Sequence, residues 1–226
     1  MSDLNLETLD EDGALRDGLD GVGIDTRAQF LRTTALGGGA LLAALVAPGA
    51  AEAQRRSRSR DKRIINFALT LELLQDSFYS EVERLGALRG DLATQAKVVG
   101  AHERAHVRAF RDVLGQDAVK RPRFNFRGAT EDSERFQRTA VAFEDLAVAA
   151  YKGQAPNIRS AEYLVPALAI HTVEARHAAW IRRLAGVSPA ENAFDEPLSR
   201  RRVERVVRAT NFTVRTRSRR RPRFTG

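Results

Sequence analysis

Four glutamates and two histidines occur along this chain in an order that is used twice: a lone glutamate, then a glutamate and a histidine three residues apart. Positions i and i+3 lie on one face of a helix, so a glutamate and a histidine at this spacing can reach the same ion. A carboxylate among apolar side chains is costly to bury unless it is paired or bound to a metal. The six residues are Glu72, Glu103, His106, Glu144, Glu174 and His177.

The spacing within the two copies also matches. The lone glutamate precedes the next one by 31 residues in the first copy and by 30 in the second. A tyrosine follows the lone glutamate by seven residues in each copy, at Tyr79 and Tyr151. We therefore interpret the sequence as two helical hairpins that each contribute half of one site. Two divalent cations would neutralise its four carboxylates and leave coordination positions open for oxygen or peroxide.

An alternative metal motif overlaps the first copy. His102, Glu103 and His106 also read as H-E-x-x-H, the zinc-peptidase pattern in which both histidines bind the metal and the glutamate activates water. A peptidase would leave Glu72, Glu144 and the whole second copy unexplained. The two-metal interpretation accounts for all six residues, and it makes His102 a structural residue that points off the ligand face.

Composition limits the chemistry of such a site. The chain has 226 residues, of which 43% are hydrophobic and 29% charged, so it can form a sizeable folded core. Cysteine is absent, which excludes disulfides, thiolate metal sites and cysteine nucleophiles. A metal ion would be held by carboxylate and imidazole groups, which suit iron, manganese or zinc.

Apolar residues at helical spacing predict an all-α fold with four long helices. The first begins at Asp61, which would cap it, and the second ends near Gly115. The third spans residues 131–152, and the fourth ends at Gly186. Residues 116–130 are a long connection, so the helices should form a four-helix bundle with one long crossover.

The segments outside this bundle have distinct compositions. Residues 199–226 hold eleven arginines and one acid, and Val203, Val206 and Val207 predict a short amphipathic helix at their start. The predicted organisation is an acidic leader and export signal over 1–53, a basic unstructured linker over 54–60, the bundle over 61–198, and an arginine-rich helix and tail over 199–226.

Residues 26–53 have the features of an export signal. Arginines precede an apolar run from Ala35 to Ala47, and Ala51-Glu52-Ala53 has the small-x-small form of a cleavage site. The segment resembles a twin-arginine signal in which Ala28 replaces the second arginine. We predict an exported, periplasmic protein; an ordinary apolar helix is the alternative.

The chain resembles the ferritin-like superfamily and, more narrowly, the exported bacterial ferritin-like domain proteins that include the desiccation-related group. The resemblance covers residues 61–198 and rests on "NFALTLELLQDSFY", "HERAHVRAF", "TAVAFEDLAVAAYKGQAP" and "AIHTVEARHAAWIRRLAG". It implies a ferritin-like four-helix bundle with a non-haem site for two iron or two manganese ions, without haem. The six glutamates and histidines listed above match the ligand pattern of that family.

Three further residues are candidates for supporting this site. The resemblance suggests that the hydroxyls of Tyr79 and Tyr151 hydrogen-bond a ligand carboxylate of the opposite hairpin; the alternative is that both are ordinary core aromatics. His171 lies one turn before Glu174 and would either support the site or be a partly buried helix histidine.

The sequence is compatible with three functions. The first is an oxidoreductase of ferroxidase, peroxidase or catalase type that acts on O2 or peroxide. The second is a non-catalytic metal-binding or stress-protection protein. The third is a basic module whose arginine-rich tail binds DNA, a membrane or another anionic surface, with the bundle as scaffold. A homo-oligomer is compatible with each of them.

Overall fold

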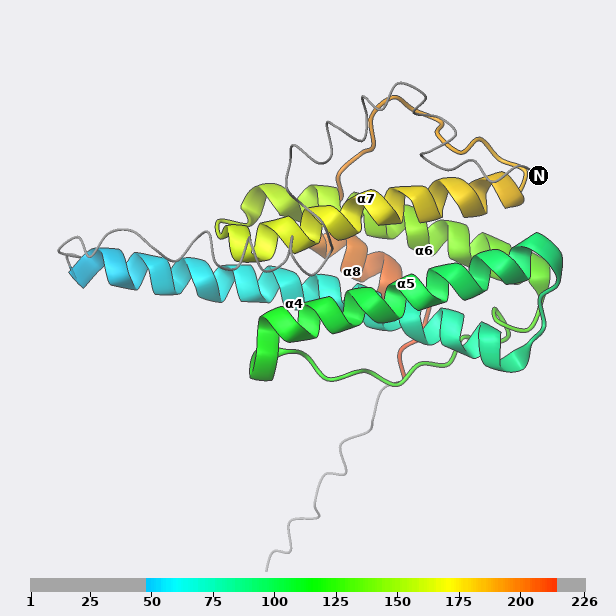
Figure 1. Cartoon of the computed structure of the whole chain (residues 1–226), viewed down its shortest axis with the longest axis horizontal. Helices are drawn as coiled ribbons and strands as arrows, with labels where there is room; N and C mark the ends of the chain where they lie inside the picture. The colour runs from blue at the N-terminus through cyan, green and yellow to red at the C-terminus, as the bar shows by residue number, and fades with distance from the viewer. Residues whose placement is uncertain (1–47, 215–226) are drawn as a thin grey trace, which may run out of the picture. The chain divides into compact units, whose positions relative to one another are not determined.

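The computed structural model describes residues 48–214, with side chains from residue 54, and every named element in that range is a helix. The predicted all-α fold is confirmed (Figure 1). The elements are α4 (Pro48–Leu85), α5 (Gly90–Leu114), η1 (Gly115–Asp117), α6 (Ser133–Gln154), η2 (Ala155–Asn157), α7 (Ala161–Leu184) and α8 (Arg200–Ala209).

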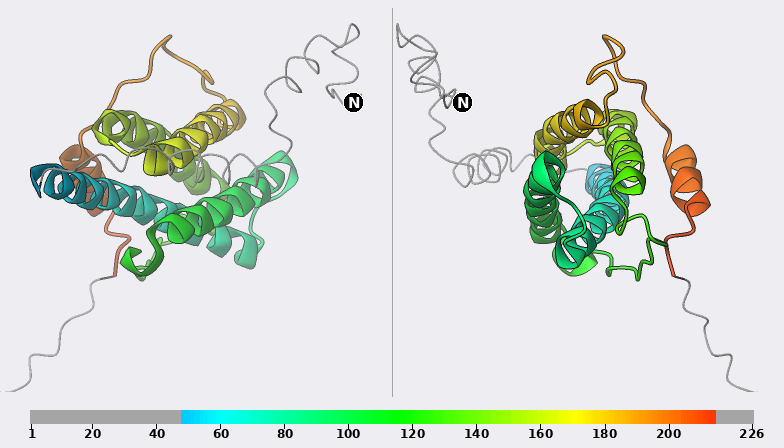
Figure 2. Two further views of the ribbon diagram at one scale, coloured as in Figure 1. Left: turned by 60° about the vertical axis from the view of Figure 1, so that its left-hand side comes forward. Right: turned by 90° about the vertical axis from the view of Figure 1, so that its right-hand side faces the viewer.

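Helices α4 to α7 form the predicted bundle with one long crossover. Short connections join α4 to α5 and α6 to α7, which makes two antiparallel hairpins (Figure 1). The long connection from η1 to α6 returns along the bundle, and the ion pair between Arg121 and Asp76 ties it to α4. Seen nearly end-on, the four helices surround one core and α8 lies outside them (Figure 2).

The first helix differs from its predicted start. Helix α4 begins at Pro48, so residues 54–60, predicted as an unstructured linker, are helical. Asp61 lies inside α4 and is completely buried, and its carboxylate accepts hydrogen bonds from the backbone N–H groups of Arg159 and Ser160. Ser160 immediately precedes α7. Asp61 therefore holds the turn that leads into α7 and does not cap its own helix, a partnership that no local sequence signal contains.

The bundle core consists of two apolar clusters with a polar layer between them. One cluster includes Leu69, Phe110 and Tyr163, and the other includes Phe78 and Phe136. In α5, α6 and α7 the residues of one cluster precede the predicted site residues and those of the other follow, and α4 departs from this order only at Leu73. The site is thus enclosed by apolar side chains at both ends, which limits its access to water.

The short helix α8 is packed against the bundle. Val203 is completely buried among residues of α4 and α6, whereas Val206, predicted for the same apolar face, is 41% exposed. The N–H of Leu198 donates to the carbonyl of Ala149 at 2.9 Å. A Cβ at Gly153 would lie 2.0 Å from the Leu198 carbonyl oxygen, so only glycine lets the chain cross α6 this closely.

Two predicted features fall on residues outside the described range. Residues 1–47 contain the acidic leader and most of the predicted export signal, and residues 215–226 contain the end of the arginine-rich tail. Among the helices of residues 48–214, none has the length and apolar character that crossing a bilayer requires.

Candidate metal centre

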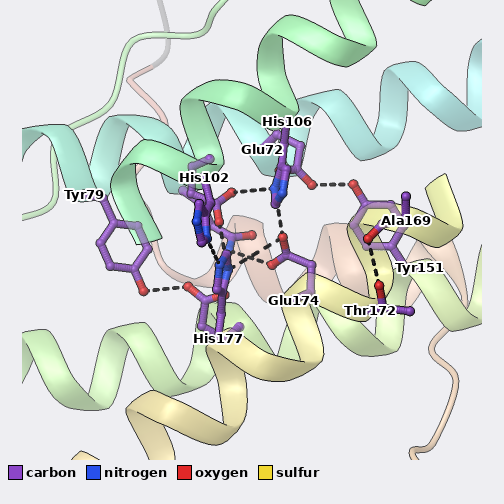
Figure 3. Close-up of polar contacts among 12 residues, drawn as sticks. Glu72, Tyr79, His102, His106, Tyr151, Ala169, Thr172, Glu174 and His177 are labelled. Carbon is purple, nitrogen blue, oxygen red and sulfur yellow. Dashed lines mark hydrogen bonds and ion pairs between the residues drawn. The ribbon is translucent and has the colours of Figure 1, made fainter. Parts of the chain in front are cut away.

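The structure brings the six sequence-predicted glutamates and histidines together at the middle of the bundle (Figure 3). Each of the four helices supplies at least one of them. All four glutamates are completely buried, and His106 and His177 are 8% and 3% exposed. The predicted juxtaposition is therefore present, and metal binding by these residues stays a prediction.

The side chains form two overlapping groups of four. The first consists of Glu72, Glu103, His106 and Glu174, and the second of Glu103, Glu144, Glu174 and His177. Within each group one potential ligand atom per residue lies within 4.8 Å of the others. Both groups contain the glutamates of the Glu-x-x-His motifs. The two groups share two carboxylates, and each adds one glutamate and one histidine of its own.

The inward-facing imidazole nitrogens lie against these carboxylates. Nδ1 of His106 is 3.1 Å from Oε2 of Glu72 and 3.1 Å from Oε1 of Glu174. Nδ1 of His177 is 3.2 Å from Oε1 of Glu103 and 3.5 Å from Oε2 of Glu144. Despite these short distances, Nδ1 of His177 has no hydrogen bond of acceptable geometry. The imidazole nitrogen of His177 is thus close to the carboxylate oxygens but is not aligned with them for a hydrogen bond.

Several buried polar atoms of the site lack hydrogen-bond partners, and they show whether the site could accommodate metal ions. Both oxygens of Glu103, one oxygen each of Glu144 and Glu174, and Nδ1 of His177 are buried without a hydrogen-bond partner. Leaving one buried polar atom unsatisfied costs about 1–3 kcal/mol, and more for a charged group. Two cations would give these atoms partners at once. The donor set and its unsatisfied atoms therefore fit metal ions that prefer oxygen and imidazole ligands.

The pKa values in the site reflect crowded negative charge. Burial raises the pKa of Glu144 to about 7, and burial together with neighbouring carboxylates raises that of Glu103 well above its usual value. Burial alone would lower the pKa of His177, but the carboxylates beside it raise it to about 12, and that of His106 is raised for the same reason. The histidines lower the pKa of Glu174 to about 2 against the effect of burial. Without metal, the site retains protons.

The two tyrosines connect the hairpins reciprocally. The hydroxyl of Tyr79 in α4 donates to Oε1 of Glu144 in α6 at 2.5 Å, and that of Tyr151 in α6 donates to Oε1 of Glu72 in α4. They approach the site from opposite ends (Figure 3). Burial raises both pKa values well above the usual range, so both hydroxyls keep the protons that they donate. The predicted cross-hairpin hydrogen bonds are confirmed.

A family model for the ferritin-like domain matches residues 60–187. The chain belongs to the ferritin-like family. A search of curated proteins found no match. The matched residues begin in α4 and end just after α7, so the ferritin-like domain contains all six site residues. Helix α8 follows the matched region, although it packs against the domain.

His102 does not have the position predicted for it. Its Nδ1 lies 2.9 Å from Nε2 of His177, and the two nearly coplanar rings meet edge to edge with centroids 5.2 Å apart. The expectation that His102 points away from the ligands considered its own helix, α5, whereas its contact is with α7. His102 belongs to neither group of potential ligands, so the ferritin-like domain does not assemble the zinc-peptidase pair.

His171 lies beside the site and not in it. Its ring stands 6.2 Å from that of Tyr151, and its buried Nδ1 has no hydrogen-bond partner. Burial lowers its pKa. Any influence of His171 on the metal positions would pass through Tyr151, which fits the interpretation as a partly buried helix histidine.

Two buried amides were missed by the sequence interpretation. Gln75 donates weakly to Oε2 of Glu174, at 3.5 Å. Gln95 is completely buried next to the Tyr79 hydroxyl, and neither of its amide atoms has a well-formed hydrogen bond. Gln95 precedes His106 by eleven residues, about three helical turns, which places it on the same face of α5. A polar residue within the apolar stripe of α5 could therefore have been identified from the sequence as a candidate neighbour of the site.

Proposed function

We propose that this ferritin-like domain binds two iron or two manganese ions and uses them for redox chemistry with oxygen or peroxide. The observation that carries the proposal is the pair of overlapping ligand groups, with unsatisfied buried atoms directed at the shared space. Four ionised glutamates would carry four negative charges, and two divalent ions neutralise them. Ionised carboxylates are costly to bury unless they are paired or bound to metal.

The residues have separate tasks in this proposal. Glu103 and Glu174 would contact both ions, Glu72 and His106 would complete one position, and Glu144 and His177 the other. Bound iron or manganese would supply changes of oxidation state that protein side chains do not provide. Tyr79 and Tyr151 hold the lone glutamates by hydrogen bonds, and the flanking apolar clusters exclude water.

We also propose that the protein is exported to the periplasm and belongs to the desiccation-related group, with a role in oxidative or desiccation stress. The support is the sequence of residues 26–53 and the resemblance of the bundle motifs. Fractionation of cells that express the natural gene, followed by mass measurement of the protein, tests this. A periplasmic species that begins near Gln54 is expected, and a full-length species confined to the cytoplasm contradicts it.

Metal content and turnover test the function directly. Purified wild-type protein should contain about two transition-metal ions per chain by elemental analysis, and the apoprotein should oxidise added ferrous ion or consume peroxide. The double variant Glu103→Ala, Glu174→Ala should do neither. A Glu134→Ala variant in an exposed pair is the control and should behave as wild type. A wild-type protein that takes up no iron or manganese would overturn the proposal.

A non-catalytic metal site is the second candidate, and the near-complete burial of all six residues favours it. A buried site can stabilise the fold or retain metal without admitting a reactant. In that case the loaded protein would melt well above the apoprotein, yet neither ferrous ion nor peroxide would be consumed. Melting and turnover measured on one preparation distinguish the candidates.

A further inference from the structure

The two metal positions have matching ligands but different surroundings. The outer nitrogen of His177, Nε2, lies 2.9 Å from Nδ1 of His102. Within residues 54–214 the structure shows no corresponding hydrogen bond at the outer nitrogen of His106. The side chain of His106 is also the more exposed of the two, at 10% against 3%.

The internal repeat explains why this contact occurs once. His102 immediately precedes the glutamate of the first Glu-x-x-His motif, and Val173 immediately precedes that of the second. The same register position thus holds a histidine in the first hairpin and a valine, which has no side-chain hydrogen-bonding atom, in the second. One metal position has a supporting imidazole that the other lacks.

We propose that His102 is a positioning residue which makes the Glu144–His177 position the tighter of the two and the first to be filled. This inference rests on the proposed binding of two metal ions. A histidine that binds metal through Nδ1 must carry its proton on Nε2. In His177 that Nε2–H would donate to Nδ1 of His102, which fixes both the tautomer and the direction of the inner lone pair.

The orientation of the two rings adds a constraint. The planes of His102 and His177 differ by only 15°, so the hydrogen bond lies nearly in both ring planes and rotation of the His177 ring would break it. The neighbouring helix thus holds His177 in the orientation that directs Nδ1 at Glu103 and Glu144. A ligand already held in place loses less freedom when the ion binds.

Stepwise metal titration tests the proposal. Apoprotein titrated with Co²⁺ without oxygen, followed by calorimetry and by the visible absorbance of the ion, should show two unequal binding steps. His102→Leu should weaken the tighter step by about 10- to 100-fold, the usual effect of removing a partner from a metal-bound histidine. The weaker step should change far less. His171→Leu is the matched control, since His171 touches Tyr151 and no metal ligand, and it should leave both steps unchanged.

Two further variants assign the effect. His102→Asn keeps an acceptor near the position of Nδ1 and should restore most of the difference between the steps. His177→Ala should abolish the tighter step and leave the weaker one. Circular dichroism melting shows whether His102→Leu is folded, and the asparagine variant provides the answer if it is not.

The possible failures are distinguishable. Wild-type protein that binds no Co²⁺ would contradict the proposed function itself. Wild-type protein that binds two ions in equal steps, or a His102→Leu variant in which both steps weaken alike, would contradict the inference about His102 and leave the two-metal site standing.

Discussion

The hairpins α4–α5 and α6–α7 present the same ligands and different supporting residues. Glu72 and Glu144, the two Glu-x-x-His motifs and the two tyrosines correspond pairwise, and the tyrosine hydrogen bonds are reciprocal. Beyond them the likeness ends. His102 and Gln75 of the first hairpin contact residues of the second, and their register counterparts are Val173 and Ala147. Two ions require equivalent ligands from both hairpins, whereas the residues that hydrogen-bond those ligands can come from one hairpin alone.

The largest effect is expected from the two glutamates that belong to both ligand groups, compared with the two that belong to only one. Replacement of Glu103 or Glu174 by alanine should abolish binding of both ions, because each belongs to both ligand groups. Replacement of Glu72 or Glu144 should remove one ion and leave the other. Elemental analysis after loading and dialysis gives the stoichiometry. Loss of a single ion from the Glu103→Ala protein would show that the glutamates are not shared.

The pH dependence of apoprotein stability tests the protonation states of Glu144, Glu174 and His177. Between pH 4.5 and about 7 the folded state holds a proton on Glu144 that the unfolded state has released, so stability should fall as pH rises. The stability contributed by protonated His177 is complete below pH 6.5 and is lost as pH rises toward about 12. That from Glu174 is present above pH 4.5 and is lost as pH falls toward about 2.

Together these three groups contribute most to stability near pH 4.5, and metal binding should reverse the trend above that pH. Ligand histidines must lose their protons to bind metal, so metal affinity should rise with pH. Urea unfolding of apo and loaded protein at several pH values measures both. The change should disappear in a Glu144→Gln, His177→Gln variant. An apoprotein whose stability increases from pH 5 to pH 8 would refute the assignment.

The tyrosines test whether the hairpins contribute equally to stability. Tyr79→Phe and Tyr151→Phe each remove one hydrogen bond to a buried carboxylate, for which a loss of about 1.5–3 kcal/mol is expected. The similar environments predict similar losses in the free energy of unfolding. Tyr163→Phe is a control, because Tyr163 is also buried but contacts no site residue through its hydroxyl in the described structure. A loss confined to one of the two tyrosines would break the symmetry at this level.

The smallest effect is expected at Gln75. Its hydrogen bond to Glu174 is long, at 3.5 Å, so Gln75→Ala, which copies Ala147 of the second hairpin, should weaken metal binding only a few-fold. Its effect should be far below that of His102→Leu in the same Co²⁺ titration. An equal effect would mean that the asymmetry does not arise mainly from His102.

Features that depend on spacing within one helix were predictable from the sequence, whereas features that depend on contacts between distant segments were not. The helices and the convergence of the six site residues were predictable, because each rests on spacing within one helix and on repetition of that spacing. The start of α4, the contact of His102 with His177 and the role of Gly153 were not predictable, because each depends on a segment that packs from elsewhere in the chain. The spacing of residues within one helix does not reveal which residues of the other helices they contact.

The buried carboxylate of Asp61 has a consequence for how this chain is made. Asp61 is 99 residues ahead of Ser160, whose backbone it holds, so it leaves the ribosome long before the turn that needs it exists. A fragment that contained only the second pair of helices would leave the N–H groups of Arg159 and Ser160, just before its last helix, without this acceptor. The hairpins look like duplicates, but the later one is completed by the earlier one.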